Sequence, residues 1–514
     1  MLVGDIPRLN ARRFPSKTAL VCGDSELTWS AVDERANRIG SWLLAQGLQA
    51  GDRVAVVCPN VLEWPEISFG VSKAGLVLVP VNVRLTVSEI TFLVEDSGAR
   101  ALIFDTSLAD TGAAVLAGVR SVAVALEVGG STAAPLYESA LAQGRAVDPT
   151  PSHATQDDLR ALLYTSGTTG LPKAVMHTHR TMLYGCLDAV MTDRSVPDDR
   201  YLAITPFFTS GGAMRTLSWT YQGQTMVILP KFDPGEIAEA VKRYAITHTI
   251  MVPTMLQRLV AHLEETSGWD LSSLTRIGYG SAPAAESLVR RVLDVTGTDL
   301  WQRYGQTEVA GFVTMLGVED HRAIADGHSE RARSCGRESP YAEIQVLDDN
   351  GTECPPGEPG ELVIRSDAVS PGYWNRPDVT AERFRGGGLH TGDIAYRDAD
   401  GYLYLVDRKN DLIISGAFNI YPGEIERVLA THAAVESVAV FGVPHPEWGE
   451  SPHAAVVLRP GHVGTEAVEA ELRGLCRREL AGYKQPGGVS FHDEFPVSGA
   501  GKVLKAELRK RVTR

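Results

Sequence analysis

The sequence lacks the features that would place this protein in a membrane, outside the cell or on nucleic acid. Its 514 residues contain no run approaching the ~20 apolar residues that span a bilayer, and the N-terminal residues have no apolar core of signal-peptide length. A formal charge of -14 argues against a nucleic-acid partner, because duplex binding draws its affinity from lysine and arginine on phosphate. We therefore expect a soluble, cytoplasmic protein.

Cysteine is scarce, and the cysteines lie far apart with no paired spacing. They are Cys22, Cys58, Cys186, Cys335, Cys354 and Cys476. This spacing argues against a disulfide framework and against a zinc site. We expect reduced thiols, most of them packed in the interior.

The length and the pattern of the chain predict an α/β protein of two domains. A chain of 514 residues is too long for one ordinary core. Short β-branched runs such as "RVAVVCPN" (53–60) and "ALIFDT" (101–106) alternate with helical patterns, which is typical of βαβ units around parallel sheets. We expect a large N-terminal domain of α/β subdomains over residues 1–409.

The sequence pattern changes from alternating strands and helices to hairpins in the last third of the chain. From about residue 330 to 409, hairpins with Asn-Gly and Asp-Gly turns predict a β-rich subdomain of the N-terminal domain. Helices and strands resume in a compact order afterwards, so residues 410–514 are predicted to form a small α+β C-terminal domain.

A loop with hydroxyls, glycines and a single cation lies within "LLYTSGTTGLPKAV" (162–175). Its chemistry-bearing residues are Thr165, Ser166, Gly167, Thr168, Thr169, Gly170 and Lys173. Glycines bring backbone N–H groups close to a ligand, hydroxyls donate hydrogen bonds and lysine adds charge, which together suit a polyphosphate. The spacing differs from the usual nucleotide-binding loop, and such a segment between a strand and a helix is by itself often an ordinary loop.

Four more motifs accompany this loop in the chain. They are "RYGQTE" (303–308), "LHTGD" (389–393), "DRKNDLIISGAFNIYPGEIE" (407–426) and "FPVSGAGKVLKAELRK" (495–510). In this order the motifs resemble those of the acyl- and aryl-CoA synthetase branch of the adenylate-forming superfamily, the AMP-binding, luciferase-like enzymes. The resemblance covers essentially the whole chain. It implies a large N-terminal domain, a small mobile C-terminal domain and an active site between them.

The resemblance also assigns ATP contacts. The loop from Thr165 to Lys173 would hold the β- and γ-phosphates, Thr307 the α-phosphate and Glu308 a Mg²⁺ ion. Further ATP-binding residues would be Ser281, Ala282, Pro283, Tyr304, Asp393 and Arg408. Tyr304 would stack on the adenine against the 281–283 backbone, and Asp393 with Arg408 would bind the ribose, although a salt bridge at a hairpin end is the alternative for that pair.

Lys502 is the residue to which the resemblance gives the most specific role. It would bridge the carboxylate and the α-phosphate during adenylation, where a cation offsets repulsion between two anions. The C-terminal domain would then rotate at a hinge at Asn410, so that Gly416 and Ala417 line the channel for CoA. Trp448 and Tyr483 match aromatic positions that sandwich the CoA adenine in some aryl-CoA ligases.

The chain departs from the family pattern at four positions. Asn410 replaces the usual Asp or Lys of the hinge, and Ala417 stands where a glycine is common. Thr209 stands where many relatives have histidine, and Gln485 where a phosphate-binding arginine is expected. Ala417 and Gln485 weaken the assignment of CoA as the acceptor, whereas Trp448 and Tyr483 favour it.

The acid to be activated is predicted only as a class. The expected pocket residues are Phe208, Thr209, Gly211, Met214, Arg215, Gly280, Val309 and Ala310. This mixture fits an aromatic or medium-chain acid. Arg215 either pairs with a polar group of the acid or makes a structural salt bridge, since a buried unpaired guanidinium is costly.

The predicted function is ATP-dependent activation of a carboxylic acid to an acyl-adenylate, followed by transfer to CoA. An alternative passes the activated group to a carrier-protein thiol, an amine or nitrite, as in an ATP-dependent diazotase. A silent ATP-sensing protein is a third hypothesis, opposed by the presence of Lys173, Glu308, Asp393 and Lys502. The expected cofactors are ATP, Mg²⁺ and CoA, and the expected partners are these and the acid, with a homodimer as a further candidate and no nucleic acid.

Overall fold

The computed structural model describes most of the chain as two compact units. The described residues are 1–130, 134–165, 172–282, 284–408, 411, 413–415, 418–446, 448–497 and 503–513. Described residues of the first unit fall within 1–165, 172–344 and 364–389, and those of the second within 345–363 and from 390 onward.

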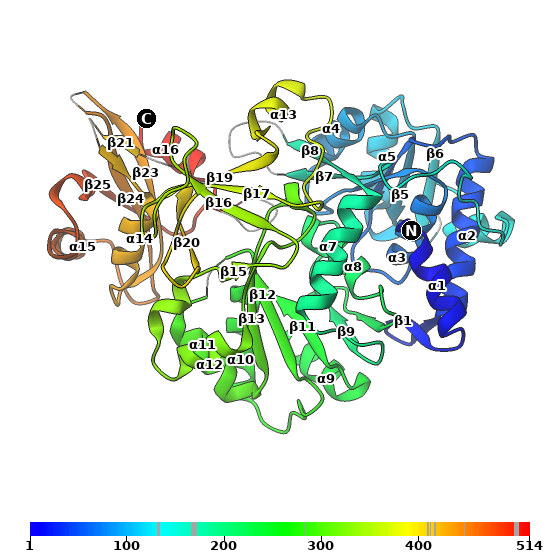
Figure 1. The fold of residues 1–514 in the computed structure, drawn as a ribbon, viewed down its shortest axis with the longest axis horizontal. Helices are drawn as coiled ribbons and strands as arrows, with labels where there is room; N and C mark the ends of the chain where they lie inside the picture. Colours follow the sequence, from blue (N-terminus) through cyan, green and yellow to red (C-terminus); the bar gives the residue numbers. More distant parts are fainter. Residues whose placement is uncertain are drawn as a thin grey trace. The chain divides into compact units, whose positions relative to one another are not determined.

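The largest sheet of the first unit has the strand order β15-β14-β13-β12-β11-β9-β10-β1-β2 (Figure 1). Its strands are β1 (Thr18–Cys22), β2 (Ser25–Thr28), β9 (Arg200–Ala203), β10 (Thr225–Ile228), β11 (His248–Met251), β12 (Arg276–Gly280), β13 (Asp299–Tyr304), β14 (Thr314–Leu316) and β15 (Arg337–Glu338). The central strands run parallel, whereas β2, β14 and β15 pair antiparallel at the edges.

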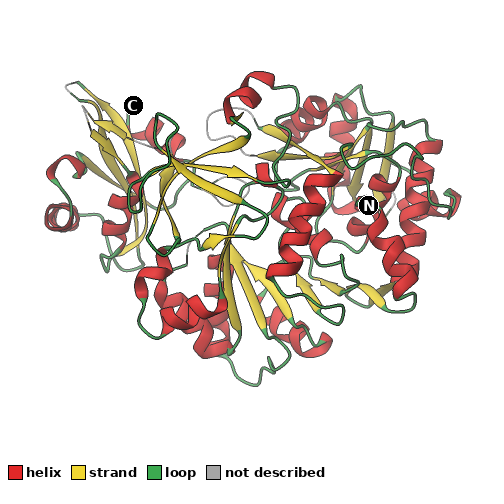
Figure 2. Ribbon diagram, in the orientation of Figure 1, coloured by secondary structure: helices red, strands yellow, loops and turns green. Residues whose placement is uncertain are grey.

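Helices alternate with these parallel strands, as the βαβ prediction requires. The helices of this part are α7 (His179–Thr192), α8 (Ser210–Ser218), α9 (Pro234–Tyr244), α10 (Pro253–Glu265), α11 (Glu286–Thr296) and α12 (Val318–Ala325). Figure 2 shows them flanking the strands. All four residues of β10 and of β11 are buried, because a parallel sheet is covered on both faces.

A second sheet of this unit has the order β6-β5-β3-β4-β7-β8. Its strands are β3 (Arg53–Val57), β4 (Val77–Pro80), β5 (Ala101–Asp105), β6 (Val124–Val128), β7 (Leu159–Thr165) and β8 (Lys173–Thr178). The helices of this region are α1 (Asp5–Arg13), α2 (Trp29–Ala45), α3 (Glu63–Lys73), α4 (Val87–Ser97), α5 (Ala109–Gly118) and α6 (Tyr137–Gln143). Apart from β8, which pairs antiparallel with β7, the pairings of this sheet are parallel.

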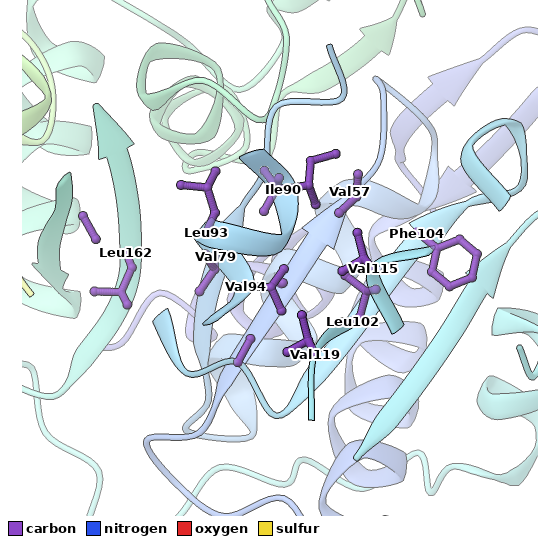
Figure 3. Close-up of a cluster of buried hydrophobic side chains, with 14 of the residues drawn as sticks. Val57, Val79, Ile90, Leu93, Val94, Leu102, Phe104, Val115, Val119 and Leu162 are labelled. Carbon is purple, nitrogen blue, oxygen red and sulfur yellow. The ribbon is translucent and has the colours of Figure 1, made fainter. Parts of the chain in front are cut away.

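One core of the first unit lies between this second sheet and two helices (Figure 3). Its buried side chains include Val57, Val79, Leu102 and Phe104 from the strands and Ile90, Leu93, Val94 and Val115 from α4 and α5. Helix α4 has local signals at both ends: a capping box of Thr86 and Glu89 at its start, and Gly98 in the left-handed conformation at its end. The caps therefore define where this helix begins and ends, and its apolar residues define the face that packs on the sheet.

The predicted β-rich region forms a sheet of order β16-β17-β19-β18, with β20 paired to β19. Its strands are β16 (Glu343–Leu347), β17 (Gly360–Arg365), β18 (Phe384–Arg385), β19 (Gly388–Arg397) and β20 (Leu403–Arg408). Helix α13 (Pro377–Arg383) precedes β18. The Asp-Gly hairpin predicted for "DIAYRDADGYLYLVDR" is confirmed, because β19 and β20 pair antiparallel around it.

The C-terminal part of the second unit has its own sheet and core. Its strands are β21 (Ile413–Ser415), β22 (Phe418–Ile420), β23 (Val435–His445), β24 (Gly449–Leu458) and β25 (Gly488–His492), and its helices are α14 (Pro422–Ala430), α15 (Glu466–Glu479) and α16 (Lys505–Val512). Ile425, Val440, Val456 and Leu472 meet in a cluster that joins α14, β23, β24 and α15. The α/β fold class with a small α+β C-terminal part is confirmed.

The expectation of free and mostly packed thiols is met within the described residues. The six cysteines are free thiols, and Cys58, Cys186, Cys335 and Cys476 are buried. No helix in the described part of the chain combines the length and the apolar content that crossing a membrane requires. The predicted domain boundary between residues 409 and 410 lies outside the described residues and stays a prediction.

Candidate active site

The predicted phosphate loop connects two antiparallel strands. The ends of the loop are defined, because Thr165 of β7 pairs with Lys173 of β8 and the Thr165 hydroxyl donates to the Lys173 carbonyl at 3.3 Å. The predicted residues Ser166, Gly167, Thr168, Thr169 and Gly170 lie outside the described residues.

A strand, and not a helix, follows this loop directly. The loop leads into strand β8, and helix α7 begins only at His179. In "KAVMHT" the positions from Val175 to Thr178 alternate between buried and partly buried, and the segment pairs with the strand that precedes the loop, so a hairpin forms before the helix.

Thr307 and Glu308 form a short turn after β13. This turn, η2 (Thr307–Val309), is a single piece of 3-10 helix. The Thr307 hydroxyl donates to the Ser210 hydroxyl oxygen at 3.0 Å, so the turn contacts the first residue of α8. His177 of β8 lies on another side, with its Nε2 2.8 Å from the Thr307 carbonyl oxygen. The turn therefore joins β8 to α8.

His177 is neutral at physiological pH. Burial lowers its pKa to about 4, because the charged imidazolium would lose its hydration in the interior. The Thr307 carbonyl can only accept, so Nε2 of the neutral ring carries the proton and donates it.

Glu308 is buried next to Tyr373. The Tyr373 hydroxyl donates to Glu308 Oε1 at 2.7 Å, and the Ser370 N–H donates to the Glu308 carbonyl at 2.8 Å. Burial, reinforced by the negative charge of Glu308, raises the pKa of Tyr373, so the phenol keeps its proton. Lys173 Nζ lies 6.0 Å from the centroid of the Tyr373 ring. Two predicted site residues, Lys173 and Glu308, thus lie near the same tyrosine.

A Mg²⁺ ion carried by a nucleotide fits this arrangement. The described residues contain no group of three or more His, Cys, Asp or Glu side chains that could hold a metal by themselves. Mg²⁺ is commonly held by one or two carboxylates together with substrate phosphates and water. Glu308 is a single buried carboxylate whose Oε1 accepts from Tyr373, and it is the residue that would hold the ion.

The predicted adenine site lies at the carboxyl ends of two neighbouring parallel strands, as in other α/β sheets. Gly280, the last residue of β12, pairs with Arg303 of β13. Ser281, directly after β12, and Tyr304, the last residue of β13, therefore lie at the same end of two adjacent strands (Figure 1). Ser281 has φ +68°, and Ala310 beyond η2 has φ +42°. Both are left-handed conformations that L side chains rarely adopt, and such strain is concentrated at functional sites. Ala282 is exposed beside Ser281, and Pro283 lies outside the described residues.

Helix α8 brings most of the predicted acid-pocket residues together. Thr209 is its N-cap: its hydroxyl accepts from the Gly212 N–H at 3.0 Å and donates to the Pro206 carbonyl at 2.7 Å. A β-carbon added at Gly211 would meet nothing within 4 Å, which leaves open space beside the first turn. Phe208 precedes the cap and is half-buried. The capping role explains how Thr209 fits where relatives have histidine.

Further pocket residues surround Gly185 of α7. A β-carbon on Gly185 would lie 1.9 Å from the Ala310 carbonyl oxygen and 3.1 Å from the Met214 Cε. Val309 and Ala310 are buried. Gly280 faces Phe312, whose ring would be 3.4 Å from a β-carbon at position 280. The predicted residues of the acid pocket in this unit therefore lie close together.

Arg215 makes the structural salt bridge that was one of its two expected roles. Its Nη1 donates to Asp193 Oδ2 at 3.0 Å, both side chains are buried, and its guanidinium lies over the Phe312 ring at 4.7 Å. Asp193 also accepts from Arg303 at 2.6 Å. A contact between Arg215 and the acid stays a prediction.

The second unit holds the predicted ribose and CoA residues. Asp393 of β19 is opposite Arg408 of β20, so the expected ribose pair are neighbours in one hairpin. Trp448 is 49% exposed and stacks on His445, with ring centroids 4.5 Å apart and planes 7° from parallel. Gly416, Ala417, Asn410 and Lys502 lie outside the described residues, as does the side chain of Tyr483 in the 482–484 turn.

Four residues near the site were missed by the sequence analysis: His177, Ser210, Ser370 and Tyr373. Their contacts join segments more than sixty residues apart. No local pattern in the sequence marks such contacts.

Comparison with known proteins matches nearly the whole chain. A family model described as AMP-binding enzyme matches residues 8–374, and one described as AMP-binding enzyme C-terminal domain matches residues 424–502. A feruloyl-CoA synthase of Amycolatopsis is 38% identical over 510 residues, which is 99% of each chain.

Solved structures share the fold along the whole chain. The amide bond synthetase McbA of Marinactinospora thermotolerans superposes with a TM-score of 0.87 at 29% identity, covering 99% of this chain and 100% of that one. The o-succinylbenzoate-CoA synthetase of Bacillus subtilis, solved with its acyl-adenylate intermediate, gives 0.85 at 28% identity and 98% of each chain. The chain therefore belongs to the AMP-binding enzyme family, within the adenylate-forming superfamily that its motifs resemble.

Proposed function

We propose that this protein is an AMP-forming acid–CoA ligase. It activates a carboxylic acid, aromatic or medium-chain, to an acyl-adenylate and then transfers the acyl group to CoA. The similarity along the whole chain to a feruloyl-CoA synthase supports both the class of acid and the acceptor.

The observation that carries the proposal is the position of the Thr307–Glu308 turn. Hydrogen bonds tie it to β8, which follows the predicted phosphate loop, and to α8, which carries the predicted acid pocket. A residue that contacts the α-phosphate must lie between the triphosphate and the acid, because the acid attacks at that phosphorus. The contacts of Thr307 with His177 of β8 and Ser210 of α8 support this role.

The first half-reaction joins two anions. A carboxylate oxygen attacks the α-phosphorus of ATP, the new P–O bond replaces the bond to the bridging oxygen, and pyrophosphate leaves with that electron pair. Since charge builds on phosphate oxygens, the protein contributes mainly alignment and electrostatic stabilisation. In the proposed complex the loop before Lys173 would hold the β- and γ-phosphates, Thr307 would contact the α-phosphate, and the charge of Lys502 would offset repulsion between the two anions. Mg²⁺ held by Glu308 would offset phosphate charge.

The second half-reaction uses the mixed anhydride as an electrophile. The CoA thiolate attacks the acyl carbon, a thioester forms, and AMP leaves with the carboxyl-phosphate oxygen. Trp448 would hold the CoA adenine on the ring face opposite His445. An amine acceptor is the second candidate, because an amide bond synthetase shares the fold over the same length.

The proposal extends to the location of the enzyme in the cell and to its oligomeric state. ATP and CoA are supplied in the cytoplasm, where we place the enzyme. A homodimer stays a prediction, which light scattering at several protein concentrations tests.

Carboxylate-dependent exchange of labelled pyrophosphate into ATP tests the adenylation step alone. We expect exchange with at least one substituted cinnamic or benzoic acid, dependent on Mg²⁺. If ATP binds but no acid of an aromatic and C6–C12 aliphatic panel supports exchange, the proposed function fails and a silent ATP-binding protein is favoured.

A further inference from the structure

Residues 370–374 connect β8 to the Thr307–Glu308 turn. The Met176 N–H donates to the Gly372 carbonyl and the Trp374 N–H to the Ala174 carbonyl, each at 2.9 Å, so the segment runs along β8. The Ser370 hydroxyl donates to the Met176 carbonyl at 2.6 Å, while its N–H donates to Glu308. One short segment therefore contacts both the strand after the phosphate loop and the predicted metal ligand.

Tyr373 is held rigidly within this segment. Its N–H donates to the Thr380 hydroxyl at 3.0 Å, its ring meets the Phe384 ring edge-on at 5.7 Å, and its side chain is buried. The neighbouring Gly372 has φ +136°, and Thr380 would lie 2.3 Å from a β-carbon there. Backbone, ring and neighbours thus define where the phenolic hydroxyl points, which is at Glu308 Oε1.

We propose that Tyr373 is a positioning residue for Mg²⁺·ATP, acting through Glu308; this rests on the proposed function. A phenol has one proton to donate, so it holds one carboxylate oxygen and leaves the other for a cation. It is also neutral, so it does not cancel the charge that attracts the metal. Hydrogen bonds to ligating carboxylates commonly change metal affinity about 10–100-fold.

ATP binding with and without Mg²⁺ distinguishes a positioning role of Tyr373 from a role in folding alone. A residue needed only for folding lowers the binding of ATP with and without Mg²⁺ alike. A residue that positions the metal ligand changes only the gain in ATP affinity that Mg²⁺ brings. That gain is measured by binding, without turnover, so it does not depend on knowing the acid.

The experiment is calorimetric titration of the full-length protein with ATP, once with Mg²⁺ and once with EDTA. For Tyr373→Phe, which keeps the buried ring, we expect the Mg²⁺-dependent gain in ATP affinity to fall about tenfold and ATP binding in EDTA to change less than twofold. Tyr244→Phe is the matched control, because it removes a phenol that donates at 3.0 Å to the Gly23 carbonyl, and its gain should equal that of wild type. An unchanged gain in Tyr373→Phe overturns the proposal.

A second pair of variants keeps the test decisive. In a Glu308→Gln background, adding Tyr373→Phe should lower the Mg²⁺-dependent gain by less than twofold further, because the two residues act as one unit. A further tenfold loss overturns the proposal.

If Tyr373→Phe does not fold, Thr380→Val replaces it, since this change removes the hydroxyl that accepts from the Tyr373 N–H. A Mg²⁺-dependent gain in ATP affinity equal to that of wild type then overturns the proposal. Absence of acid-dependent exchange in wild type counts against the proposed function and leaves this binding result standing.

Discussion

The Nε2 atom of His177 lies 2.8 Å from the carbonyl oxygen of Thr307, 130 residues away along the chain. The contact fixes the start of the turn that carries Thr307 and Glu308. His177 belongs to β8, so the same strand that begins with Lys173 also holds the turn.

The first prediction follows from that contact. His177→Leu removes the donor to Thr307, and we expect kcat for pyrophosphate exchange to fall about tenfold, since a lost buried hydrogen bond costs about 1–3 kcal/mol. His177→Gln places an amide N–H near the position of Nε2 and should recover most of the rate. Steady-state exchange kinetics with both variants measure this, and equal loss in Leu and Gln variants would refute a hydrogen-bonding role.

The second prediction concerns the buried ion pairs beside the acid pocket. Asp193→Ala leaves Arg215 and Arg303 without the carboxylate they share, and we expect the free energy of unfolding to fall by about 3–5 kcal/mol. Asp24→Ala is the control, because its pair with Arg243 has the same 3.0 Å length but is exposed, so its loss should leave the free energy of unfolding nearly unchanged. Denaturant unfolding measures both, and similar losses in the two variants contradict the burial argument.

The third prediction is an acid-sensitive fold. Burial lowers the pKa of His179 and of His321 to about 4 in the folded protein, whereas an unfolded histidine titrates near 6.5. The unfolded chain therefore binds more protons between these values. The contribution of each neutral, buried histidine to the free energy of unfolding is fully present above about pH 6.5. It is lost as the pH falls toward 4, which lowers the free energy of unfolding by about 3 kcal/mol per histidine.

His321 provides the test of this pH dependence. Its Nδ1 donates to the Gly317 carbonyl at 2.7 Å and its Nε2 accepts from the Tyr279 hydroxyl at 2.9 Å. The free energy of unfolding, measured with denaturant between pH 4 and 7.5, should fall less steeply with decreasing pH in His321→Gln than in wild type. The difference in slope should correspond to about one bound proton. The exposed His462→Gln should keep the wild-type slope, and a wild-type slope in His321→Gln as well would show that His321 does not contribute.

The fourth prediction concerns the acceptor site. His445 stacks on Trp448, which is 49% exposed, and we propose that the CoA adenine stacks on the face opposite His445. We expect Trp448→Ala to raise the KM for CoA about tenfold, because base stacking contributes about 1–3 kcal/mol, while pyrophosphate exchange stays unchanged. Trp269→Ala, which removes a tryptophan packed on His262, is the control. An unchanged KM for CoA in Trp448→Ala would exclude this ring from the site.

Much of the fold could be predicted from local patterns. Helix α4 shows its apolar spacing, its capping box and its terminal glycine in a single stretch of sequence. The β19–β20 hairpin has an Asp-Gly turn between alternating residues. Strand β8 was missed because six residues after a glycine-rich loop carry little periodicity, and only pairing with β7 defines them as a strand.

The site could be predicted in part. Thr307, Glu308 and Lys173 lie in motifs that resemble those of known enzymes. Their supporting residues could not be predicted, because the contacts of Tyr373 with Glu308 and of Arg215 with Asp193 depend on how distant segments pack. A tyrosine in "GYWN" and an arginine in "GGAMRT" give no local sign of these partners.

Mass spectrometry of the products decides whether the activated acid passes to CoA. The wild-type enzyme is incubated with ATP, Mg²⁺ and an acid that supports exchange, in parallel with CoA, an amine, a carrier protein or nitrite. We expect AMP and the acyl-CoA thioester, with the thioester formed faster than any other adduct. Acyl-adenylate that accumulates in the presence of CoA, together with rapid formation of an amide or another adduct, would contradict this expectation.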